Sequence, residues 1–67
     1  MTIILNNTPE QLPGEFLTIK DILRIKNFSF PNLVVKINGT LVKKPFYDQT
    51  TVKAGDNVEI IHLISGG

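Results

Sequence analysis

The residues best suited to chemistry are the last two, Gly66 and Gly67, which follow a long apolar segment. The α-carboxyl group of Gly67 has an ordinary pKa of about 3.5, so at neutral pH it is an anion and a poor electrophile. A nucleophile can attack this carbon only after one oxygen becomes a better leaving group, most simply in an acyl-adenylate made from ATP. Gly67 is therefore the candidate for a chemically modified terminus.

The sequence just before the terminus suits entry into a partner's site. Glycine has no Cβ and a wide range of backbone angles, so it passes where other residues would clash. We expect Ser65, Gly66 and Gly67 to form a flexible reactive tail and residues 1–64 to form one folded domain. Extended residues from Ile64 to Gly67 would reach about 13 Å. On composition alone, the interpretation that this terminus has no function also remains open.

Other kinds of site have little support in the 67 residues. The chain has no cysteine and one histidine, His62, which cannot by itself supply the four ligands of a structural zinc site. We interpret His62 as structural, predict no catalytic residue and no metal, and expect the protein not to be an enzyme. Seven Lys and Arg against six Asp and Glu give no basic stripe, and Lys43-Lys44 is interpreted as a solvated turn, so no nucleic acid is expected.

Hydrophobic runs are too short for a membrane span, and the N-terminus lacks the features of a signal peptide. No membrane association is expected, and the predicted location is the cytoplasm.

Local signals predict one helix and a mixed sheet. Thr18 is the expected N-cap, with Asp21 as a short capping-box acid, and Ile19, Ile22 and Leu23 follow at helical spacing up to about Asn27. Strands are predicted at 2–6, 10–12, 33–37, 40–42 and 57–63, with an irregular segment at 43–51. The second strand should lie at an edge because Pro9 lacks an N–H. Asn38-Gly39 predicts a tight hairpin, Asp56 a turn, and Phe28 and Phe30 should close one end of the core.

One helix covers only one face of a sheet, so the alternation of side chains assigns two faces. The helix face should hold Ile3, Leu5, Val35, Ile37, Val58 and Ile60. The open face then carries Val34, Ile61 and Leu63, which is unusually apolar for a solvated surface. Two interpretations stay open: a partner-docking patch, or scattered exposed hydrophobic residues.

The whole chain resembles the ThiS-type sulfur carriers of thiamine biosynthesis, within the ubiquitin-like β-grasp superfamily. The resemblance rests on residue patterns in order along the chain: Ile3-Ile4-Leu5-Asn6, Thr18-Ile19 with Ile22-Leu23, Val35-Lys36-Ile37-Asn38-Gly39, Val42 with Lys44 and Tyr47, Gly55-Asp56-Asn57-Val58-Glu59-Ile60, and Gly66-Gly67. It implies an α+β β-grasp fold, with a mixed sheet of four to five strands packed on one helix. Lys43 departs from the family, which often has proline there.

The resemblance also implies partners and a reaction cycle. An E1-like adenylating enzyme of the ThiF type would use ATP to convert the Gly67 carboxylate into an acyl-adenylate. Sulfur derived from cysteine by a desulfurase would then give a thiocarboxylate, which a thiazole synthase of the ThiG type would consume. The chain itself is expected to bind no cofactor.

Related functions remain as alternatives. The small subunit of molybdopterin synthase has the same fold and tail, but prolines often precede its glycines, and none does so here. A ubiquitin-like protein modifier would pass through the same adenylate. Small RNA-associated β-grasp domains share the hairpin and turn, although near-neutral charge and the terminal glycines disfavour them.

Overall fold

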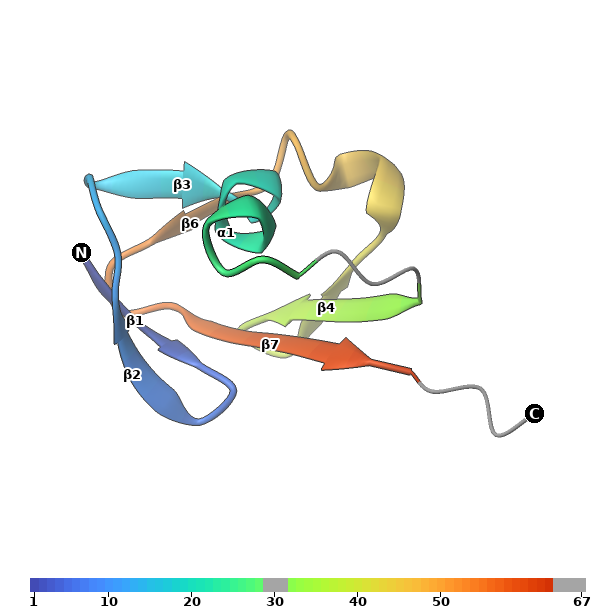
Figure 1. The fold of residues 1–67 in the computed structure, drawn as a ribbon, viewed down its shortest axis with the longest axis horizontal. Helices are drawn as coiled ribbons and strands as arrows, with labels where there is room; N and C mark the ends of the chain where they lie inside the picture. Colours follow the sequence, from blue (N-terminus) through green and yellow to red (C-terminus); the bar gives the residue numbers. More distant parts are fainter. Residues whose placement is uncertain (29–31, 64–67) are drawn as a thin grey trace.

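The structure is a computed structural model that describes residues 1–28 and 32–63. Its main element is a five-stranded mixed sheet with the order β2-β1-β7-β4-β5. The strands are β1 (Thr2–Leu5), β2 (Thr8–Gln11), β4 (Leu33–Ile37), β5 (Thr40–Val42) and β7 (Asn57–His62). β1 and β7 are parallel, and the other neighbours are antiparallel. Figure 1 shows helix α1 (Ile19–Ile25) on one side of this sheet, as a β-grasp fold requires.

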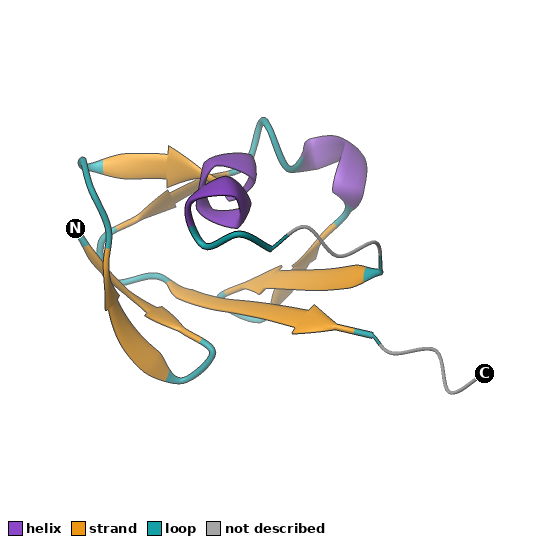
Figure 2. Ribbon diagram, viewed as in Figure 1, coloured by secondary structure: helices purple, strands orange, loops and turns teal. Residues whose placement is uncertain are grey.

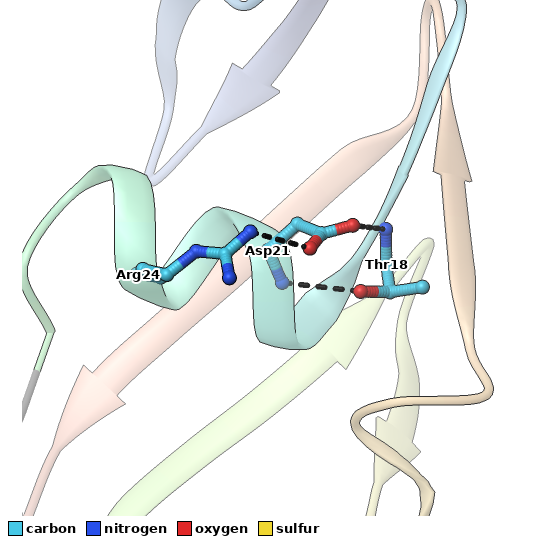
Figure 3. Close-up of polar contacts among 3 residues, drawn as sticks. All are labelled: Thr18, Asp21 and Arg24. Atoms are coloured by element: carbon cyan, nitrogen blue, oxygen red, sulfur yellow. Dashed lines mark hydrogen bonds and ion pairs between the residues drawn. The ribbon is translucent and has the colours of Figure 1, made fainter.

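Helix α1 begins at the predicted residue. Thr18 is the N-cap, and its hydroxyl oxygen accepts a hydrogen bond from the Asp21 N–H at 3.1 Å. The Thr18 N–H donates in return to Asp21 Oδ2 at 3.1 Å, and Arg24 pairs with the other carboxylate oxygen (Figure 3). This capping box satisfies backbone donors that a helix start leaves without partners.

The end of the helix is set by Asn27, which has a φ of 58°. In this left-handed conformation the Asn27 N–H donates to the Arg24 carbonyl at 3.2 Å. The Phe28 N–H donates to the Leu23 carbonyl at 2.8 Å, which completes the Schellman arrangement. The partly buried Phe28 packs against the core as expected, whereas Phe30 lies outside the described residues.

The prediction missed a second, two-stranded sheet. β3 (Phe16–Thr18) pairs antiparallel with β6 (Thr51–Lys53), and it lies on the same side of the main sheet as α1 (Figure 2). The segment 43–51 was expected to be irregular, but it holds a 3-10 helix at Lys44–Phe46 and its last residue begins β6. Three-residue strands are too short for a side-chain alternation to identify them.

The core confirms most of the predicted inward face. It contains nine buried hydrophobic residues: Ile3, Leu5, Leu12, Ile19, Ile22, Val35, Val52, Val58 and Ile60. Ile37, also predicted inward, is partly buried against this cluster. Val52 comes from the missed strand β6, so the small second sheet closes the core beside α1.

The predicted turns and edges also appear. Asn38 and Gly39 have φ values of 49° and 86°, which suit the tight turn between β4 and β5. β2 is the edge strand that Pro9 requires, although it starts at Thr8 rather than at Glu10. β7 reaches His62 and stops one residue before the predicted end.

Candidate functional site

The predicted tail of Ser65, Gly66 and Gly67 lies outside the described residues, as does Ile64 at the end of the predicted domain. The structure therefore describes the support from which this segment continues. That support is β7, whose last residue is His62, followed by Leu63. The Leu63 N–H donates to the carbonyl of Asn32, the residue before Leu33, at 2.9 Å, so backbone pairing with this neighbouring segment continues to the last described residue.

β7 is held along one side by β4. Five residue pairs join these strands, from Ile37 opposite Val58 to Leu33 opposite His62. The backbone of β7 is thus aligned along its length by a neighbour that is itself held by β5. The last described residues, His62 and Leu63, therefore have a fixed position relative to the domain.

The other side of β7 is held differently, because β1 pairs with it only through Ile4 and Leu5. Beyond Leu5, it is Asn6 that pairs with the backbone of β7. Its N–H donates to the Val58 carbonyl at 2.9 Å. Its side-chain oxygen accepts from the Ile60 N–H at 2.8 Å, and its side-chain nitrogen donates to the Ile60 carbonyl at 3.1 Å. One amide side chain thereby extends the parallel ladder to Ile60.

The start of β7 is anchored by Asp56, a buried polar residue with 7% of its surface exposed. Its carboxylate accepts from the Lys53 N–H at 3.0 Å and from the Asn38 side chain at 3.2 Å. The backbone bond from Lys53 is the largest of the effects that hold the pKa of Asp56 below its ordinary value, and removal from water opposes it. The predicted turn role of Asp56 is confirmed, and the bond from Asn38 also joins it to the β4–β5 hairpin.

Two residues of the predicted open face, Val34 and Ile61, are neighbours in the structure, as expected. Val34 lies directly opposite Ile61 in the β4–β7 ladder, so their side chains share one face. Ile61 is 47% exposed and Leu63 is 53% exposed, while Val34 is partly buried. The apolar surface therefore adjoins the point where the chain leaves β7. Whether a partner covers it stays a prediction.

Leu41 belongs to this face and was missed. It lies opposite Lys36, which in turn lies opposite Glu59, and it is 54% exposed. The signal was present in the sequence, since a two-residue Asn38-Gly39 turn places residues 36 and 41 opposite one another. The open face therefore carries Leu41, Val34, Ile61 and Leu63, with an opposite-charge Lys36–Glu59 pair among them.

Neither a metal-binding cluster nor a membrane-spanning helix is found in the part of the chain that the structure describes. Residues 1–28 and 32–63 contain no group of three or more His, Asp or Glu side chains placed to hold a metal ion. Within the same residues, no helix has both the length and the apolar character needed to cross a membrane. His62 lies opposite Leu33 at the end of β7 and is exposed.

Comparisons with known proteins agree with this geometry. A family model described as the ThiS family matches residues 3–67. A crystal structure of the thiamine biosynthesis protein ThiS from Geobacter metallireducens is similar to this chain at 30% identity, with a TM-score of 0.88 and complete coverage of both chains. An NMR solution structure of a thiamine biosynthesis protein from the same organism is also 30% identical, with a TM-score of 0.75, and covers all of this chain and 88% of the other.

Proposed function

This chain belongs to the ThiS family, and from that premise we propose that it carries sulfur for thiamine biosynthesis on the carboxyl group of Gly67. The observation that carries the proposal is the family match, which extends through Gly66 and Gly67 to the last residue. The solved structures named as thiamine biosynthesis proteins support the thiamine pathway over the molybdopterin pathway and over protein modification.

The proposed chemistry begins with activation. The Gly67 carboxylate attacks the α-phosphate of ATP in an adenylating enzyme, which forms the acyl-adenylate and releases pyrophosphate. A persulfide that a desulfurase forms from cysteine then attacks the acyl carbon, and the bond to AMP breaks to give an acyl disulfide. A second thiol of the sulfur donor cleaves this disulfide, which leaves a thiocarboxylate on Gly67 and a disulfide on the donor. The thiocarboxylate passes its sulfur to a thiazole synthase. In this scheme ATP is bound by the activating partner, and the chain acts as a substrate and carrier in the cytoplasm rather than as an enzyme.

In the proposed scheme the folded domain holds β7 in place and contacts the partner, while the chemistry takes place at the terminus. Asp56 anchors the start of β7, Asn6 binds its middle at Ile60, and Leu63 is bonded to Asn32 at its far end. A strand fixed at three points defines the position of Leu63, from which the chain continues towards Gly67. The exposed Ile61 and Leu63 lie at this end of the strand, where a partner that receives the Gly67 carboxylate would also contact the domain.

Intact-mass analysis of the protein purified from its native host tests the proposal. We expect a fraction of the chain to be heavier by the replacement of one oxygen with sulfur, and the mass change should map to the C-terminal peptide. A chain lacking Gly67 is the control and should never show this change. Isolation of the chain joined through Gly67 to lysine side chains would instead favour the modifier function, and an unmodified terminus under thiamine starvation would contradict both.

A further inference from the structure

Strand β5 forms one edge of the main sheet, and among the described residues no strand lies along its outer side. An edge strand presents backbone N–H and C=O groups that can pair with another extended chain. β5 is distant in the sheet order from β1 and β2, and it is separated from β7 by β4. Leu41 of β5 borders the open face, but the outer backbone edge of β5 lies two strands away from β7.

Two hollows adjoin β5. The first, of about 450 Å³, is lined mainly by apolar side chains, among them Leu33, Val34, Leu41, Val42 and Tyr47. The second, of about 410 Å³, shares Leu41 and Val42 and adds Phe46. Leu41 and Phe46 are 54% and 52% exposed, which is high for large apolar residues. Hollows beside an edge strand can receive alternate side chains of an added strand.

The charge around this edge is positive. Lys43 follows β5 directly and borders both hollows, and Lys44 borders the first. A third hollow next to them is bordered by Lys20 and Lys44, with Asp48 as its acidic residue. Short edge strands and lysines at an edge are features by which natural proteins avoid pairing of two copies edge to edge. The same lysines attract an acidic segment.

We propose that the outer edge of β5 binds an extended segment of a partner protein in which acidic and apolar residues alternate. The segment adds a sixth strand to the sheet, its apolar side chains enter the hollows beside Leu41 and Val42, and its carboxylates pair with Lys43 and Lys44. Main-chain pairing supplies affinity, and the hollows and lysines supply selectivity. The interaction requires no reaction at Gly67.

Binding of a short synthetic peptide that alternates valine with glutamate tests this proposal. We expect backbone amide NMR signals of residues 40–44 to shift on titration and the affinity to fall with added salt, because exposed charge pairs are screened. The Lys43→Gln/Lys44→Gln double variant should bind roughly tenfold more weakly. Lys53→Gln is the control and should bind like the wild type, because Lys53 borders none of the three hollows, although its exposed ammonium group lies 3.6 Å from Asp56 Oδ1.

Four further measurements can overturn the proposal. A peptide of the same composition with N-methylated alternate residues cannot complete a strand ladder, so equal binding of this peptide would refute strand addition. Equal binding of a valine–lysine peptide would refute the role of charge. Concentration-dependent dimerisation through residues 40–44, or tighter binding of an RNA oligonucleotide than of the acidic peptide, would assign this edge to another occupant.

Discussion

The side-chain amide of Asn6 binds both backbone groups of Ile60, a residue 54 positions away in the sequence. The N–H of Ile60 donates to Asn6 Oδ1 at 2.8 Å, and Asn6 Nδ2 donates to the Ile60 carbonyl at 3.1 Å. Asn6 has a φ of 51°, so the chain turns away towards β2 at the residue whose side chain continues the ladder. The β1–β2 hairpin can therefore end without leaving the backbone of β7 unpaired at Ile60.

Replacing Asn6 with glycine should remove both side-chain bonds while keeping a residue that tolerates positive φ. We expect the free energy of unfolding to fall by about 1–3 kcal/mol, since each net hydrogen bond contributes roughly 0.5–1.5 kcal/mol. Urea unfolding measures this, and faster amide exchange at Ile60 should accompany it. Asn7→Gly is the matched control, because Asn7 also has positive φ, at 67°, and should change stability much less. Equal losses in the two variants would show that the turn, and not the amide bonds, is responsible.

The carboxylate of Asp56 should make stability depend on pH. Its pKa is lower in the folded protein than in the unfolded chain, where it is about 3.9, so the unfolded chain binds the proton more readily. The stabilisation is present above the unfolded pKa and is lost as the pH falls through the folded pKa. Asp56→Asn should lower the free energy of unfolding by about 1–3 kcal/mol at pH 7.

The difference between wild type and Asp56→Asn should shrink steadily below about pH 4, which urea unfolding at a series of pH values would measure. Asp48→Asn, at an exposed position outside this network, is the control for the general effect of losing one negative charge. A difference that stays constant down to low pH would mean that Asp56 acts through its shape rather than through its charge.

Ile61→Asp should weaken binding to the adenylating enzyme by at least about tenfold, because it places an unpaired charge within the proposed apolar contact. The stability of the domain should change little, since Ile61 is already 47% exposed. Titration calorimetry and urea unfolding separate the two effects. Ile25→Asp is the matched control for binding: it changes an isoleucine that is 41% exposed on α1, away from the open face, and should leave the affinity for the adenylating enzyme unchanged. Loss of stability without loss of binding would remove Ile61 from the docking surface.

Gly67→Ala should lower adenylation by at least about a hundredfold, because a Cβ beside the reacting carboxylate displaces it within a narrow site. ATP–pyrophosphate exchange with the adenylating enzyme measures this step. Ser65→Ala, which adds no bulk to the proposed tail, should keep nearly full activity. Unchanged exchange with the Gly67 variant would show that the terminus does not have to fit closely.

Several local features could be predicted from the sequence because each depends on neighbouring residues. Thr18 and Asp21 are three residues apart and form their capping box with no help from the rest of the chain. Asn38 and Gly39 tolerate the positive φ angles of their turn, and strand alternation separates Val34 and Ile61 from the core. The hairpin also specified Leu41, whose place follows from counting outward from Asn38-Gly39.

The proposed reactive end depends on the sequence alone, since only the identities of Gly66 and Gly67 and the family pattern point to it. Tertiary structure decided how β7 is held: Asn6 reaches Ile60, Asn38 reaches Asp56, and β3 pairs with β6. The residues in each of these pairs lie far apart along the chain, so local propensities cannot predict the contacts between them. They become neighbours only because burial of the core against α1 fixes the order of the strands. Once that order is set, the short polar side chains can form their hydrogen bonds and the three-residue strands can pair.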